Sequence, residues 1–203
     1  MSTLPIYLYG SDVLRQKAKP VKGLDNETIK LIYDLFETMY KSHGVGLAAT
    51  QVGEMKRVIV VDVTPTEEEP EDGQELSELE KNQPKKLVLI NPEIIGKSGL
   101  WSMEEGCLSI PDVRADVERP ETIRVRYRNA NFEEVELEAT GMLGRVILHE
   151  TDHLDGVLFI DYLSTAKRAL LRGKLKNIKK GEVETSYQVV TAPAPRRSGK
   201  VEV

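Results

Sequence analysis

GMLGRVILHETDHLDG, residues 141–156, is the stretch that predicts the centre of the fold. Four of its side chains recur at spacings of four, three and four, namely Met142, Val146, His149 and His153. Such spacing places side chains on one side of a helix. Gly156 suits the position just beyond a last helical turn. We therefore predict a core helix that presents two histidines on one face.

Within this stretch, HETDH places His149 and His153 on either side of Glu150. Residues i and i+4 of a helix lie one turn apart on the same face, so both imidazoles can reach one metal ion. The glutamate can then reach a water molecule bound to that ion. Two histidines that merely share a core helix are the alternative interpretation, and a third ligand would decide against it.

Downstream of HETDH, the sequence lacks the third ligands that zinc proteases use. A metzincin would have a histidine where Phe159 stands. A thermolysin-type protease takes a glutamate from a later helix, and no glutamate lies between His153 and Glu182. Upstream, the only cysteine, Cys107, lies in WSMEEGCLSIPDVR. Two histidines and one cysteine would leave the fourth position of a metal open for water, as hydrolysis requires.

Strand patterns occupy much of the chain on either side of Cys107. Residues 57–63 form a β-branched run typical of a buried strand, and residues 87–95 have extended character. Residues 122–128 and 134–139 alternate between apolar and polar side chains, which predicts an antiparallel hairpin with one solvated face. The turn falls at residues 129–131.

Helical patterns lie at both ends. Residues 25–41 place apolar side chains at helical spacing behind Asp25 or Asn26, either of which can cap the first turn. Near the other end, Ser164 can cap a last helix that is rich in lysine and arginine.

The length of 203 residues suits one core with appendages. We expect a catalytic domain over residues 1–165, a basic C-terminal helix over 166–181 and a flexible tail over 182–203. Residues 64–85 are acidic, polar and proline-bearing, which predicts an inserted surface loop. The roles of this loop and of the tail are not readable from the sequence, and neither is the oligomeric state.

Charge and composition exclude several classes of protein. The net charge of −5 argues against sequence-specific binding to nucleic acid. The N-terminus lacks a secretory signal, and no apolar run is long enough to cross a bilayer, so we expect a cytoplasmic protein without a membrane partner. A single cysteine forms no intramolecular disulfide, so nothing favours an oxidising compartment.

Three motifs together resemble those of the peptide deformylase family, in order and in spacing: GVGLAATQVG at 44–53, EGCLSIP at 105–111 and HETDHLDG at 149–156. The likeness covers roughly residues 5–165. It implies an α+β fold in which antiparallel sheets surround a central helix that carries the HExxH motif, with a further helix near the C-terminus. It also implies metal ligands Cys107, His149 and His153, with Glu150 as general acid and base.

The resemblance further implies how substrate binds. The side-chain amide of Gln51 and the backbone N–H of Leu108 would donate to the oxyanion. Gly46 would bring backbone close to the substrate peptide, and Arg114 would pair with the substrate or with a structural carboxylate. A pocket for the methionine side chain would include Val45, Glu105, Met142 and Val146, each of which could instead be an ordinary core residue.

The function implied is metal-dependent removal of the formyl group from the formylmethionine of nascent proteins. The family resemblance implies Fe²⁺, although the ligand set also suits Zn²⁺, Ni²⁺ or Co²⁺. It also implies contact between the basic last helix and the ribosome, against a merely solvated helix face. Substrate preference beyond formylmethionine is not readable. Many family members have glutamine where this chain has Leu148, which puts the hydrogen bonding around the ligands in doubt.

The sequence leaves two other functions open. One is a zinc endopeptidase that uses the same HExxH pattern, and cleavage of internal peptide bonds would distinguish it from a deformylase. The other is a non-enzymatic, ribosome-associated module with a structural metal site. Against the second stands the count of three protein ligands, since structural sites normally have four.

Overall fold

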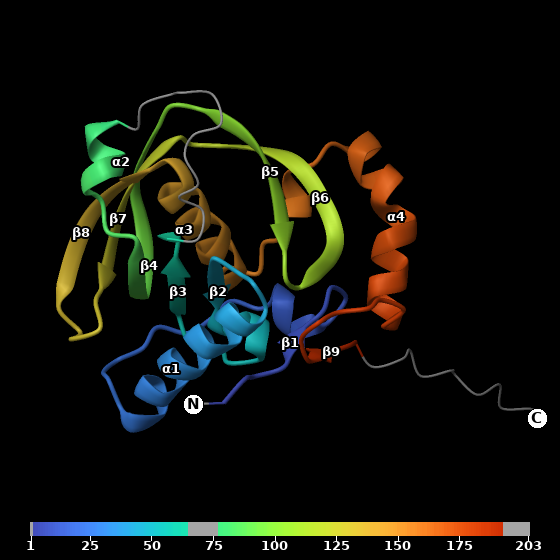
Figure 1. The fold of residues 1–203 in the computed structure, drawn as a ribbon, viewed down its shortest axis with the longest axis horizontal. Helices are drawn as coiled ribbons and strands as arrows, with labels where there is room; N and C mark the ends of the chain where they lie inside the picture. The colour runs from blue at the N-terminus through green and yellow to red at the C-terminus, as the bar shows by residue number, and fades with distance from the viewer. Residues whose placement is uncertain (1, 65–76, 193–203) are drawn as a thin grey trace, which may run out of the picture.

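The computed structural model describes residues 2–64 and 77–192, which form a mixed α/β fold of antiparallel sheets and helices (Figure 1). The helices are α1 (Asn26–Lys41), α2 (Glu78–Asn82), α3 (Gly141–Leu154) and α4 (Thr165–Lys180), with short 3-10 helices η1 (Asp12–Arg15), η2 (Ala49–Val52) and η4 (Phe159–Tyr162). The strands are β1 (Ile6–Tyr7), β2 (Gly46–Ala48), β3 (Val58–Asp62), β4 (Lys86–Ser98), β5 (Trp101–Cys107), β6 (Ile110–Arg119), β7 (Thr122–Arg128), β8 (Glu134–Thr140) and β9 (Val189–Val190).

A five-stranded antiparallel sheet in the order β2-β3-β4-β7-β8 forms the centre of the fold. Strand β3 has a helix on each of its faces, which explains its unbroken β-branched run. Ile59 and Val61 pack in the cluster that includes α3, whereas Val58 and Val60 pack in the cluster that includes α1. Successive side chains of a strand point to opposite faces, so every residue of β3 is buried.

Helix α3 carries HETDH and packs against β2 and β3. Leu143, Ile147 and Leu148 are buried in the cluster between the helix and the sheet. Gly156 follows the helix with a φ of +75° and lies so close to the backbone of Arg15 that a Cβ would stand 2.6 Å from a carbonyl oxygen. The predicted helix and its glycine stop are both present, and Leu148 is a core residue.

The hairpin predicted over residues 122–139 is present as β7 and β8, paired antiparallel with Val125 opposite Leu137. Both predicted helix caps are also present. The backbone N–H of Thr28 donates to Asp25 at 2.7 Å at the start of α1, and that of Lys167 donates to Ser164 at 3.2 Å at the start of α4. The observed α4 begins and ends one residue before the predicted range.

A second hairpin, β5–β6, was not predicted from the sequence. Its two strands pair from Trp101 opposite Arg119 to Cys107 opposite Ile110. Figure 1 shows β6 between the central part of the molecule and α4, and α4 packs on it. Strand β5 ends at Cys107, at the turn of the hairpin, and this places the cysteine beside the C-terminal half of α3.

The acidic segment 64–85 is not a loop throughout. Ser77 caps α2 by accepting from the N–H of Glu80, and the Glu80 carboxylate accepts from the Ser77 N–H in return. Gln83 is buried and exchanges two hydrogen bonds with the backbone of Thr140. The prediction of a solvated loop was therefore wrong for residues 77–85, because local capping orders this part, and residues 65–76 lie outside the description.

The prediction of a flexible tail from residue 182 was also wrong over its first half. Residues 182–192 return to the body of the molecule, where β9 pairs in parallel with β1. The segment lacks an apolar period, but backbone hydrogen bonds to β1 hold it without one. Residues 193–203 lie outside the description. Among the helices of the described residues, none is both long and apolar enough to span a membrane.

Candidate metal centre and catalytic cleft

Cys107, His149 and His153 converge at the end of the β5–β6 hairpin. Their candidate ligand atoms all lie within 4.8 Å of one another, and the Cys107 Sγ is 3.2 Å from the His153 Nε2. The two imidazoles come from adjacent turns of α3, with ring centroids 5.1 Å apart. One thiolate and two imidazoles form a donor set that suits a divalent transition metal and leaves a fourth position for water or substrate.

Glu105 selects the nitrogen that His149 can offer to a metal. Its Oε2 lies 2.9 Å from the Nδ1 of His149, which leaves Nε2 for coordination. A carboxylate on the second ring nitrogen is a common partner of a metal-binding histidine. The sequence placed Glu105 in a methionine pocket. It does line the cleft, but its buried carboxylate faces His149 and two arginines.

Those arginines, Arg119 and Arg145, were not singled out in the sequence. Arg119 Nε donates to Glu105 at 2.6 Å, and Arg145 Nη1 donates to the same carboxylate at 2.9 Å. Arg119 Nη1 also donates to Asp152 at 2.6 Å, and the Tyr162 hydroxyl donates to Asp152 at 2.9 Å. The sequence did contain a signal for both: Arg119 and Arg145 each occupy a buried position among the apolar residues of β6 and α3.

The cluster stabilises the ionised form of Glu105. Burial alone would raise the pKa of this carboxyl, but the hydrogen bonds from His149 and Arg119 outweigh burial and hold the pKa at about 2. For His149, burial alone would lower the pKa, but the contacts with Cys107 and Glu105 outweigh burial and raise the pKa well above its ordinary value. For His153, burial and the charge of His149 both lower the pKa, which favours the neutral ring.

Glu150 lies beside the ligands and against β2. Its Oε2 is buried and has no hydrogen-bond partner among the described residues, and burial raises the pKa of its carboxyl to about 7. A Cβ on Gly46 would stand 2.6 Å from Glu150 Oε1 and 2.6 Å from Val146 Cγ1. Only glycine at position 46 lets the carboxylate occupy this place.

Gln51, on η2, points its amide nitrogen toward the sulfur of Cys107. Its Oε1 accepts from the Ala48 N–H at 2.8 Å, which fixes the amide orientation. Its Nε2 lies 3.3 Å from Ser109 Oγ and 3.6 Å from Cys107 Sγ. The amide donor therefore faces the space beside the three candidate metal ligands.

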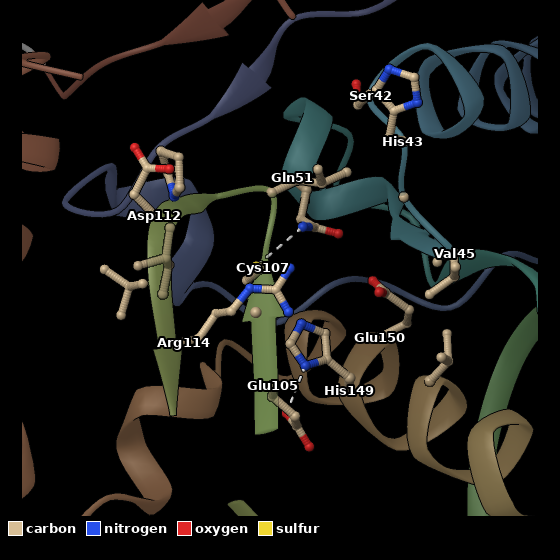
Figure 2. Close-up of a pocket in the computed structure, with 18 of the residues that line it drawn as sticks. Ser42, His43, Val45, Gln51, Glu105, Cys107, Asp112, Arg114, His149 and Glu150 are labelled. Atoms are coloured by element: carbon tan, nitrogen blue, oxygen red, sulfur yellow. Dashed lines mark hydrogen bonds and ion pairs between the residues drawn. The ribbon is translucent and has the colours of Figure 1, made fainter. Parts of the chain in front are cut away.

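An open cleft of about 630 Å³ lies over these groups. Figure 2 shows Gln51, His149 and Glu150 around the space near Cys107, with His43 and Asp112 farther out. Its walls include Glu105 and the other residues predicted to contact substrate: Val45, Gly46, Leu108, Arg114, Met142 and Val146. Arg114 is largely exposed and lies 3.7 Å from Glu104, so it has a carboxylate partner within its own hairpin. Residues 184–187 also line the cleft and were not predicted to do so.

A mixed α/β fold with one cysteine and two histidines at the base of an open cleft, next to a buried glutamate, defines a hydrolase of the metalloenzyme class. The family model for polypeptide deformylase matches residues 3–169. The chain belongs to the peptide deformylase family.

Relatives and solved structures agree with this assignment. A peptide deformylase of Salinibacter ruber is 52% identical over 190 residues, covering 93% of this chain and 94% of that protein. The crystal structure of peptide deformylase from Ehrlichia chaffeensis superposes with a TM-score of 0.78 at 35% identity, covering 90% of this chain and 98% of that one. The structure from Synechococcus elongatus, in complex with actinonin, gives a TM-score of 0.71 at 39% identity and covers 94% of each chain.

The protein is therefore a peptide deformylase in activity, a hydrolase that removes the N-formyl group from nascent proteins. This outcome agrees with the resemblance read from the three sequence motifs. The family and the relatives support the deformylase rather than the endopeptidase or the non-enzymatic module.

Proposed function

We propose that Cys107, His149 and His153 hold one divalent metal ion and that deformylation occurs in the cleft above it. The observation that carries the proposal is the convergence of three donors, two from α3 and one from β5, at the base of that cleft. We propose Fe²⁺ as the physiological ion on the strength of the family resemblance. The same donors would also hold Zn²⁺, Ni²⁺ or Co²⁺.

In this mechanism Glu150 is the general base and then the general acid. When bound, the metal lowers the pKa of a water molecule toward neutrality and so supplies the nucleophile for attack on the formyl carbon. Glu150 accepts the proton of that water and delivers it to the departing amine nitrogen. A carboxyl pKa of about 7 suits both steps near neutral pH.

Gln51 and Leu108 stabilise the oxyanion. The Gln51 Nε2, fixed by the bond from Ala48 to its oxygen, and the backbone N–H of Leu108 donate to the oxygen of the former carbonyl. Loss of one such donor lowers turnover by roughly 100- to 1,000-fold. Leu108 follows Cys107 directly in the chain, and Gln51 approaches the same cysteine from η2, with its Nε2 3.6 Å from the Cys107 Sγ.

The substrate peptide lies along β2. This strand is at one end of the five-stranded sheet, so its outer edge can accept an added strand, and Gly46 lies on it next to Glu150. Val45, Met142 and Val146 form the pocket for the methionine side chain, because they are the apolar members of the adjoining wall. Glu105 positions His149, and Arg114 pairs with the substrate backbone.

The catalytic unit is organised around α3, with the sheets and the β5–β6 hairpin about it, over residues 1–165. We place the protein in the cytoplasm, where formylated nascent chains are made. We also propose that α4 contacts the ribosome. Its exposed surface carries many basic side chains, while only Leu175 and Ile178 are buried, and basic side chains attract RNA phosphates.

The test of catalysis is formate release from a formyl-Met peptide by anaerobically purified protein. We expect activity in the wild type and a loss of at least about 100-fold in Glu150→Gln, with metal content unchanged. Glu138→Gln, on the exposed part of β8, is the matched control and keeps full activity. Equal activity in wild type and Glu150→Gln at full metal occupancy would refute the mechanism.

Ribosome contact requires a separate measurement. We expect Arg172→Glu combined with Lys176→Glu to reduce co-sedimentation with ribosomes at low salt, since both side chains are exposed on α4. Formate release from a free peptide stays at the wild-type rate. Unchanged co-sedimentation of the double variant would argue against α4 as the contact surface.

A further inference from the structure

The C-terminal strap, defined here as residues 182–192, follows α4 and returns across the molecule to β1. Gly181 ends α4 with a φ of +77°, which turns the chain back. The strap is then held by backbone bonds from the N–H of Ile6 to the oxygen of Gln188 at 2.9 Å and from that of Leu8 to the oxygen of Val190 at 2.8 Å. These bonds fix the part of the strap that adjoins the cleft.

Residues 184–187 of the strap form one wall of the catalytic cleft. Tyr187 packs against the apolar cluster that includes α1 and β3, and its hydroxyl donates to the carbonyl oxygen of Leu108 at 2.8 Å. Burial, with the nearby Cys107, raises the pKa of Tyr187 to about 12, so the phenol keeps its proton. Thr185 stabilises the same bend by donating to the Tyr187 carbonyl at 2.8 Å.

The turn of residues 107–109 is therefore held by the strap both directly and indirectly. Tyr187 binds the carbonyl of Leu108, and the N–H of Tyr9, just beyond β1, donates to the carbonyl of Ser109 at 2.8 Å. Strand β1 is itself paired with β9 of the strap. The side chain of Gln51 also contacts this turn, through the side chains of Ser109 and Cys107.

We propose that the strap is part of the active site and that Tyr187 is a positioning residue for the oxyanion donor. By fixing the Leu108 carbonyl, Tyr187 fixes the rotation of the 107–109 turn and with it the direction of the Leu108 N–H. This inference rests on the proposed role of Leu108 as a donor. An oxyanion donor stabilises the transition state more than it stabilises the bound substrate. Misdirecting the donor should therefore lower kcat and leave KM unchanged.

Tyr187→Phe in the zinc-loaded protein, compared with wild type, tests the proposal. We expect kcat for a formyl-Met peptide to fall on the order of 10-fold, with KM within about twofold of wild type. Amide hydrogen exchange in the 107–109 turn becomes faster, while exchange in α3 is unchanged. A purely structural role would lower thermal stability without this separation of kcat from KM.

Tyr33→Phe, on the exposed face of α1, is the matched control and retains the wild-type kcat, KM and exchange. Thr185→Val is a milder second variant, expected to shift kcat in the same direction by a smaller factor, and it decides the matter if Tyr187→Phe does not fold. Wild-type kcat in the folded variant, at full zinc occupancy, would overturn the positioning role. Absence of formate release from the wild type would instead refute the proposed function.

Discussion

Arginine–glutamate pairs occur in two regions of this molecule, and the two regions differ in burial rather than in chemistry. On the β7–β8 hairpin, Arg126 donates to Glu136 at 2.9 Å, and both side chains are more than 40% exposed. Behind the proposed metal ligands, Arg119 donates to Glu105 at 2.6 Å, and both side chains are at most 5% exposed. Similar pairs therefore experience very different solvent screening.

The difference teaches what each set of charges does. The hairpin pairs lie on the solvated face of alternating strands, where water competes for every charge and either partner can be removed at little cost. In the buried cluster, Glu105 has three partners, and loss of one leaves the others charged and out of water. One of those partners is His149, a proposed metal ligand, so the charges around Glu105 connect stability with the site.

The largest effect is expected for Glu105→Gln. The change leaves Arg119 and Arg145 buried without their carboxylate, so the free energy of unfolding falls by about 3–5 kcal/mol. Because Glu105 also orients His149, zinc affinity falls by about 10- to 100-fold. Urea unfolding and chelator competition measure the two quantities. Glu104→Gln, one residue away and exposed, is the control, and equal losses in both variants would remove the distinction between the regions.

The second largest effect is expected from acid, which should destabilise the buried pair more than the exposed pairs. Glu105 has a folded pKa of about 2 against an ordinary 4.5, so its ionised form contributes stability above pH 4.5, which is lost as the pH falls toward 2. The contribution is at most about 3 kcal/mol. Unfolding of metal-free wild type and Glu105→Gln between pH 6 and pH 2 measures this contribution. We expect the difference between their free energies of unfolding to become smaller as the pH falls. A difference that stays constant over this pH range would contradict the low pKa of Glu105.

A smaller effect is expected when the charge is kept and the geometry changed. In Arg119→Lys, an ammonium replaces the guanidinium that reaches Glu105 through two nitrogens and Asp152 through a third. We expect a loss of about 2 kcal/mol in the free energy of unfolding, because buried hydrogen bonds to charged groups are lost. Arg126→Lys on the hairpin is the matched control, with a much smaller change. Equal changes in the two variants would show that burial is not what matters.

The smallest effect is expected for Arg126→Ala. The side chain pairs with Glu136 in solvent, so its removal should lower the free energy of unfolding less than Glu105→Gln or Arg119→Lys does. The remaining difference from wild type should shrink further in high salt, because salt screens exposed charges. Urea unfolding at low and high salt is the measurement. A large loss that persists in high salt would place the hairpin pairs in the same category as the buried cluster.

Local sequence patterns predicted much of the fold. The periodicity of residues 25–41 and 141–156, the β-branched run at 57–63 and the alternation at 122–139 each correspond to an observed element. These patterns succeed because they report which face of an element is buried. They failed at α2 and at the strap, where the decisive contacts are a reciprocal cap at Ser77 and backbone pairing with β1, neither of which depends on apolar periodicity.

The sequence by itself determined the chemistry of this protein: two histidines one turn apart with a glutamate between them, one cysteine, and three family motifs in register. Only the tertiary structure decided which groups surround that chemistry. It placed Glu105 with Arg119 and Arg145 behind His149, and it brought Tyr187 to Leu108 from 79 residues away. The physical reason is that residue type and spacing specify what a side chain can do locally, whereas its partners depend on how distant elements pack together.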